Sequence, residues 1–194
     1  REIGETIDSG RRPVEGIEAC VTGTGKGPEA MPKTGWKSFN VHERWGGFDQ
    51  TTWFRFTITV PESMRGERVV AFVRPGGESL AYVNGKPFHG VDKWHDELVL
   101  TDKARAGQMF EIVLESVPSV RFDDYHHFEY ADLAVMQPEV WEFYWDCQVA
   151  YEVWETLAEA SAERQRLMEL LNGVVKGVDL QHAVTERYHD SIAK

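Results

Sequence analysis

A short segment near the middle of the chain gathers side chains that suit a sugar. Asp92, Asp96 and Glu97 lie beside Trp94 and His95. An aromatic face together with hydrogen-bonding carboxylates suits a polyol, and cleavage of a glycosidic bond needs two carboxylates that face each other. The chain has 32 acidic residues, so the presence of carboxylate pairs does not identify a catalytic pair. Tryptophan is highly buried on average, which favours the alternative, a loop around a buried Trp94.

A second segment, residues 122–129, holds two aspartates, two histidines and a glutamate. Imidazole and carboxylate groups bind zinc and similar ions, so a metal-dependent enzyme centred on residues 123–129 is one hypothesis. On an extended chain, however, the adjacent His126 and His127 point in opposite directions. We therefore favour a solvated loop between two strands, and we predict no metal site, no resident cofactor and no catalytic residue in this chain.

The overall composition excludes several classes of partner. Lys and Arg number 21 against 32 Asp and Glu, for a net charge of −11, whereas phosphate-backbone binding needs a basic face. Nucleic acid and anionic membrane surfaces are therefore poor partners. No apolar run approaches the roughly 20 residues of a membrane-spanning helix. Two cysteines, Cys20 and Cys147, are too few for a disulfide framework, which favours a reducing compartment and a cytoplasmic location.

The elements that must position these residues are mostly strands. Residues 1–35 are rich in Gly and Pro and predict loop with one short strand at 16–21. Residues 52–60 alternate cleanly, with Phe54, Phe56, Ile58 and Val60 on one side, until Pro61 ends the run. Further short strands are predicted at 68–73, 79–83, 97–100, 109–116 and 131–136. Asn84-Gly85 predicts a tight hairpin between residues 80–83 and residues 86–89. This spacing predicts an antiparallel β-sandwich over residues 1–136.

The periodicity changes at residue 137. Pro138 suits the first turn of a helix, and apolar residues then recur at steps of three and four. Ser161 is a candidate cap for a second helix, Gly177 ends it, and Asp179 is a candidate cap for a third. Residues 137–194 therefore predict a helical subdomain. Its aromatic first helix, around Trp141, Trp145 and Trp154, is expected to leave apolar surface for a neighbour.

Two stretches carry a family pattern: WGGFDQTTWFRF at 45–56, running on to Val-Pro at 60–61, and GESLAYVNGKP at 77–87, followed by GVD at 90–92 and His95. The order continues with LTDKA at 100–104, Gly107, ADL at 131–133 and EVW at 139–141. Together they resemble the N-terminal accessory region of the bacterial and cytosolic-type α-mannosidases of glycoside hydrolase family 38. The resemblance covers about residues 36–180 and implies a galactose-binding-like jelly roll.

The catalytic domain of that family opens with a Gly-His-Ala/Ser-His-Ile-Asp type of motif, which binds its divalent metal. Neither His182 nor His189 lies in such a motif, so the family's catalytic residues correspond to no position here. The resemblance thus implies a non-catalytic domain, whose helices at 137–194 lead into a catalytic domain outside this chain. The missing domain is expected to bind a divalent metal such as zinc. The expected partners are that domain, mannosides and further copies of the parent enzyme.

One rival to this interpretation is a stand-alone carbohydrate-binding module, in which loops of the sandwich hold a sugar. Its candidate binding residues are Trp45, Asp92, Trp94 and His95.

Overall fold

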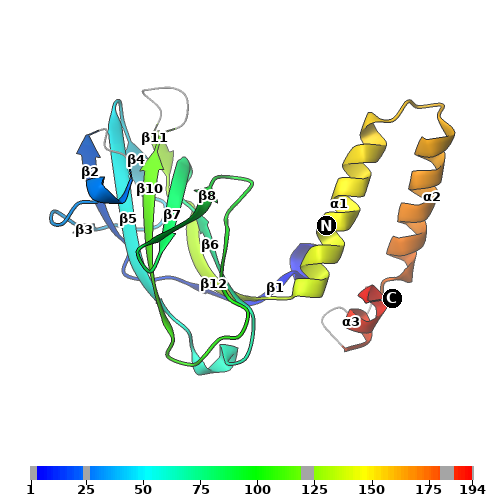
Figure 1. Cartoon of the computed structure of the whole chain (residues 1–194), viewed down its shortest axis with the longest axis horizontal. Helices are drawn as coiled ribbons and strands as arrows, with labels where there is room; N and C mark the ends of the chain where they lie inside the picture. The colour runs from blue at the N-terminus through cyan, green and yellow to red at the C-terminus, as the bar shows by residue number, and fades with distance from the viewer. Residues whose placement is uncertain (1–3, 24–26, 119–124, 180–185, 194) are drawn as a thin grey trace. The chain divides into compact units, whose positions relative to one another are not determined.

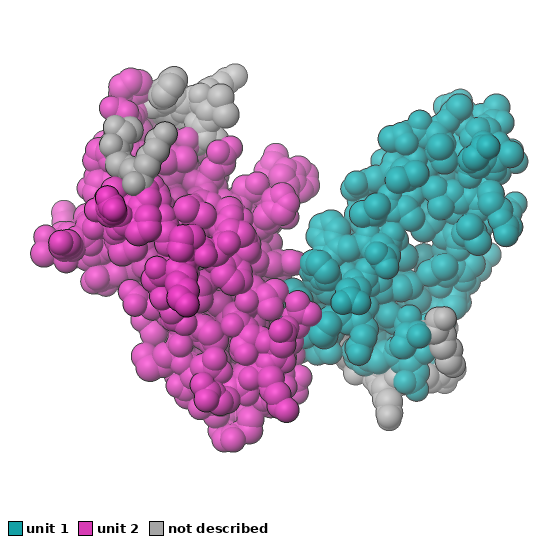
Figure 2. Space-filling model, in the orientation of Figure 1, with its two compact units in different colours: residues 1–9, 136–194 teal, residues 10–135 magenta. Residues whose placement is uncertain are grey.

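The computed structural model describes residues 4–23, 27–118, 125–179 and 186–193. The chain divides into two compact units, residues 10–135 and residues 1–9 with 136–194 (Figure 2). The strands are β1 (Asp8–Pro13), β2 (Glu18–Gly23), β3 (Lys37–Ser38), β4 (Arg44–Gly46), β5 (Gln50–Thr59), β6 (Val69–Arg74), β7 (Glu78–Val83), β8 (Lys86–Val91), β9 (Glu97–Thr101), β10 (Met109–Val117), β11 (Tyr125–His127) and β12 (Tyr130–Met136). The helices are α1 (Pro138–Thr156), α2 (Ala162–Gly177) and α3 (Glu186–Ile192), with short 3-10 turns at Gly4–Thr6, Pro28–Ala30 and Glu62–Met64.

The first unit is an antiparallel β-sandwich, as the strand spacing predicts, and a jelly roll, as the resemblance implies (Figure 1). A six-stranded sheet has the order β3-β2-β5-β10-β7-β8, and a four-stranded sheet has the order β1-β12-β6-β9. A small two-stranded sheet pairs β11 with β4. Phe54, Phe56 and Ile58 of β5 lie in the core with Ile112 and Leu114 of the neighbouring β10. The alternation of apolar residues in β5 therefore predicted correctly which of its side chains face the core.

The Asn84-Gly85 hairpin is confirmed. Asn84 has φ 51° and Gly85 has φ 73°, and Val83 pairs with Lys86 across the turn. Positive φ at both central residues is the requirement of the two-residue turn that matches strand twist. The turn sets the register of β7 and β8, and β8 leads directly into residues 92–96.

The described part of the N-terminal region forms more strand than its composition predicts. Besides β2, it forms β1 at the edge of the four-stranded sheet, where all of its residues except Asp8 are exposed. An exposed edge strand needs no alternating apolar residues, so its sequence resembles a loop. The loop prediction for residues 8–13 was therefore wrong.

The second unit is helical. Pro138 is the first residue of α1, and the Ser161 hydroxyl accepts a hydrogen bond from the Arg164 amide at 3.1 Å, so both helix starts are confirmed. The α2 helix ends at Gly177 as expected, and the described part of the third helix begins at Glu186. A small core joins Ile7, Val140, Val178 and Tyr188. Among the described residues, no helix has the length and apolarity to cross a bilayer.

Candidate functional site

The structure brings three of the four predicted binding residues together. Asp92, Trp94 and His95 lie in the turn of residues 92–96, which joins β8 of the six-stranded sheet to β9 of the four-stranded sheet. Trp45 lies elsewhere, in β4, where its partner across the small sheet is His126. The candidate site is therefore the turn alone.

Trp45 is a core residue. Only 4% of it is exposed, and its indole Nε1 donates a hydrogen bond to the Pro75 carbonyl oxygen at 2.6 Å. Its ring meets Phe54 edge-on at 5.4 Å between centroids and lies against the His126 ring at 5.3 Å. Both the face and the polar edge of the indole are thus occupied by protein, which leaves no surface of Trp45 for a sugar.

The Asp92 carboxylate organises the turn. Its Oδ1 accepts hydrogen bonds from the amides of Trp94 at 2.7 Å and His95 at 2.9 Å, and it lies 3.1 Å from the His95 Nδ1. The Asp92 amide also donates to the His95 carbonyl oxygen at 3.2 Å. Aspartate commonly accepts from amides two and three residues ahead, and here that pattern closes the turn on both sides.

These donors predict an acid-sensitive turn. Burial alone would raise the pKa of the Asp92 carboxyl, but the amides of Trp94 and His95, with the His95 ring, hold that pKa below its ordinary value of 3.8. A lowered pKa means that the ionised carboxylate stabilises the turn above the ordinary value, and that this contribution is lost as the pH falls through the lowered pKa. In an NMR titration from about pH 6 to pH 2, the Trp94 and His95 amides should shift with a midpoint below 3.8.

The control for that titration is Asp92→Asn, whose amide oxygen still accepts hydrogen bonds but does not ionise. Its Trp94 and His95 amides should lack the transition. A wild-type midpoint at or above 3.8 would show that the amide donors do not stabilise the carboxylate.

Trp94 is at the surface, with 72% of it exposed, so the prediction of a buried Trp94 was wrong. The hydrogen bonds of the Asp92 carboxylate hold the turn at the sandwich surface. The Lys93 Nζ lies over the Trp94 indole, 4.8 Å from the ring centroid. Average burial describes tryptophans in general, whereas this tight turn has no core-facing position for a large ring.

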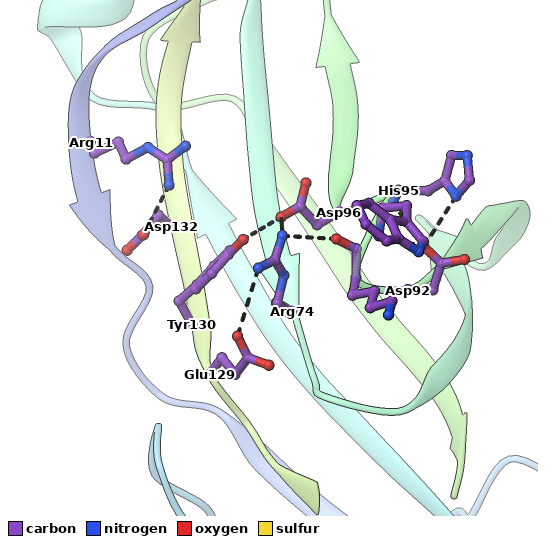
Figure 3. A network of polar contacts seen from close by, with 10 residues as sticks. Arg11, Arg74, Asp92, His95, Asp96, Glu129, Tyr130 and Asp132 are labelled. Atoms are coloured by element: carbon purple, nitrogen blue, oxygen red, sulfur yellow. Dashed lines mark hydrogen bonds and ion pairs between the residues drawn. The ribbon is translucent and has the colours of Figure 1, made fainter. Parts of the chain in front are cut away.

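A polar network behind the turn was missed by sequence reasoning. Asp96 Oδ2 accepts a hydrogen bond from Arg74 Nη2 at 2.7 Å and another from the Tyr130 hydroxyl. The same Arg74 Nη2 donates to the Lys93 carbonyl oxygen at 3.0 Å, and Arg74 Nη1 lies 3.8 Å from Glu129 Oε2 (Figure 3). Arg74 therefore contacts the turn at two points, Lys93 and Asp96.

This network is partly shielded from solvent. The Asp96 side chain is 14% exposed, and the Arg74 guanidinium lies over the Tyr130 ring at 5.1 Å. Burial raises the pKa of the Tyr130 hydroxyl well above its ordinary value, and the Asp96 carboxylate raises it further. Tyr130 thus stays a hydrogen-bond donor to Asp96 throughout the neutral range. Arg74 and Tyr130 are direct partners across β6 and β12, a pairing that no local sequence pattern reveals.

The segment proposed as a metal centre is only partly described, since Asp123 and Asp124 lie outside the described residues. Tyr125–His127 forms β11, so this part of the predicted loop is a strand, in which the His126 ring packs against Trp45. Within the described residues, no group of three or more His, Cys, Asp or Glu side chains is arranged to hold a metal ion. The turn of residues 92–96 presents an exposed indole for stacking and the polar side chains of Asp92 and His95 for hydrogen bonding.

Comparison with known proteins gives one family and a set of solved structures. Residues 13–153 match the model of the family described as alpha-mannosidase, jelly roll domain. Comparison with curated proteins gives no match.

The similar structures include a glycosyl hydrolase family 2 member from Bacteroides cellulosilyticus (14% identity, TM-score 0.47, 66% of this chain and 20% of that chain). They also include the β-glucuronidase from Ruminococcus gnavus in complex with N1-substituted uronic isofagomine (10% identity, TM-score 0.45, 65% and 29%). A β-glucuronidase from an uncultured Clostridium species is a third (11% identity, TM-score 0.43, 66% and 29%). The chain thus spans less than a third of the length of each.

Proposed function

Because the chain belongs to the alpha-mannosidase jelly roll domain family, we propose that it is the non-catalytic N-terminal domain of a family 38 α-mannosidase that packs on the catalytic domain of the same polypeptide. The family assignment agrees with the resemblance seen in residues 45–56 and 77–87. The docking partner and the docking role are the proposal.

One observation carries the docking role: the long helices bury almost none of their own residues. Val140 is the only buried residue of the 19 in α1, and none of the 16 in α2 is buried. Large apolar side chains are exposed on both helices, and we name them the α1–α2 apolar residues: Trp145, Val149, Tyr151, Val153, Leu170, Val174 and Val175. Trp141 and Trp154 are half-buried. Exposed apolar surface of this kind indicates an interaction partner.

The space between the helices supports the same role. A groove of about 390 Å³ separates α1 from α2 and is lined by Tyr144, Tyr151, Met168 and Leu171 among others. Helical pairs stabilise themselves mainly by packing an apolar stripe, and here much of that stripe faces the groove or solvent. A catalytic domain that covers the α1–α2 apolar residues would remove this surface from water.

In the proposed enzyme, the catalytic domain carries out metal-assisted retaining hydrolysis of terminal α-mannosides. That domain, and not this chain, would hold a divalent metal such as zinc. The proposed enzyme is cytoplasmic and assembles as a homo-oligomer. The present chain would contribute a folded support and a wall of the substrate cleft.

The test is complementation in trans. The chain alone should be folded and inactive on an aryl α-mannoside, and it should bind an apolar dye whose fluorescence falls when the separate catalytic domain is added. Val149→Glu together with Leu170→Glu should weaken domain association by at least about tenfold, since each places a charge on an apolar contact.

The matched control is Val21→Glu, which replaces an equally exposed valine on β2 of the sandwich. Association should be unchanged in that variant. Equal association of the catalytic domain with the wild type and the α1–α2 double variant would overturn the proposed docking role.

A further inference from the structure

We propose that the turn of residues 92–96 is a binding site for one pyranose ring, with Trp94 as its stacking face and Arg74 as the residue that positions the turn. This site goes beyond the proposed docking role. It lies in the sandwich unit, whereas the α1–α2 apolar residues lie in the helical unit. The two proposals therefore stand or fall separately.

The first argument is the exposure of Trp94. At 72%, it has the highest exposed fraction among the large apolar side chains of the described residues. An indole carries a negative π face and contributes a large contact area when covered. One side of a pyranose presents C–H groups with partial positive charge, and these complement such a face. The exposed ring is thus of the size and polarity that a single sugar ring requires.

The second argument is the polarity of the residues that share the turn with Trp94, which favours a sugar over a protein partner. The His95 side chain is 72% exposed and the Asp92 side chain 40% exposed, and the Lys93 Nζ lies over one side of the indole ring. Energetically dominant aromatics of protein interfaces lie among other buried contacts that exclude water. Here the neighbours of Trp94 in the turn are a carboxylate, an imidazole and an ammonium group. These groups can donate to and accept from sugar hydroxyls.

The third argument is that the turn is held in place before any ligand arrives. On one side it follows Val91, and on the other it precedes Leu98, both of them buried in the core. Arg74 Nη2 contacts both the Lys93 carbonyl oxygen and Asp96, and the Val73 amide donates to the Asp96 carbonyl oxygen at 2.7 Å. A preformed site loses less conformational entropy on binding, which matters for a ligand as small as one sugar ring.

The binding test is an NMR titration of the 194-residue chain with mannobiose. We expect chemical-shift changes at the Trp94 indole N–H and at the amides of Lys93 and His95, with a Kd of about 1–10 mM. Trp94→Ala should weaken binding by at least about tenfold. The control Trp145→Ala, which removes an exposed tryptophan of α1, should leave the Kd unchanged.

The positioning test compares three variants at a temperature where all are folded. Arg74→Gln removes the charge and the shared donor, and should weaken mannobiose binding at least about fivefold while increasing the fast motion of the Trp94 and His95 amides. Arg74→Lys should restore part of the affinity because it keeps a charged donor. Tyr130→Phe keeps Arg74 and Asp96 paired and should change the Kd by less than about twofold.

Several results would overturn the proposal. One is the absence of shifts in wild type at about 50 mM mannobiose, well above the expected Kd. Others are shifts remote from Trp94, or equal Kd values for Trp94→Ala and wild type. If Trp94→Ala instead weakens association with the catalytic domain and leaves sugar binding intact, the turn is a protein contact and the sugar site is wrong. Loss of docking in the α1–α2 double variant with normal mannobiose binding would support both proposals.

Discussion

Replacing Trp45 with alanine is expected to lower the free energy of unfolding by about 3–5 kcal/mol. The indole is almost fully buried, and its removal leaves a cavity beside Phe54 and His126 and an unpaired carbonyl at Pro75. Urea denaturation followed by near-ultraviolet circular dichroism measures the loss. Because Trp45 has no exposed face, the folded fraction of the variant should still bind mannobiose with the wild-type Kd.

Trp45→Phe separates packing from hydrogen bonding. Phenylalanine keeps an aromatic edge against Phe54 but leaves the Pro75 carbonyl without its 2.6 Å donor, which should cost about 1–3 kcal/mol. A Trp45→Ala variant with wild-type stability and no sugar binding would return Trp45 to a binding role and contradict its placement in the core.

The second large effect is expected at Gly76. This residue has φ 95°, and a Cβ there would clash with the His127 carbonyl oxygen and lie 3.2 Å from the His126 Cβ. Gly76→Ala therefore combines an unfavourable backbone conformation with a backbone clash, and should destabilise the sandwich by about 3–5 kcal/mol. The same urea denaturation measures the change. The contact matters because Gly76 lies where the loop after β6 passes the strand β11.

Gly85→Ala is the matched control for strain without a clash. Gly85 has φ 73°, and a Cβ there would meet no atom within 4 Å. Only the conformational cost of about 1–2 kcal/mol is expected. Equal losses at Gly76 and Gly85 would show that the approach of β11 to Gly76 is looser than the structure indicates.

Much of the sandwich was predictable because its elements obey local rules. The alternation from Thr52 to Val60 follows from the two-residue period of a strand, and the Asn84-Gly85 turn follows from the positive φ that both residues tolerate. Pro138 and Ser161 mark helix starts through the missing amide of proline and the accepting hydroxyl of serine. Each rule depends on residues only a few positions apart.

The candidate site was predictable only in part. Asp92, Trp94 and His95 are neighbours in the chain, so their proximity in space follows directly from the sequence. Arg74 and Tyr130 complete the site from strands that are distant from the turn in the sequence. Their contact depends on the pairing of β6 with β12. The exposure of Trp94 depends on where the turn leaves the sandwich, and the sequence prediction had it buried.

The sequence by itself determined the antiparallel β-sandwich, the strand and helix starts that follow local rules and, through a resemblance, the alpha-mannosidase jelly roll domain family. The tertiary structure decided that Trp45 lies in the core and that Trp94 lies at the surface, although both have glycine and aspartate nearby in the sequence. Trp45 is buried because β4 pairs with β11 and brings its ring against Phe54, whereas Trp94 is exposed because Asp92 closes a tight turn at the junction of two sheets. Burial is a property of long-range packing, and composition alone does not encode it.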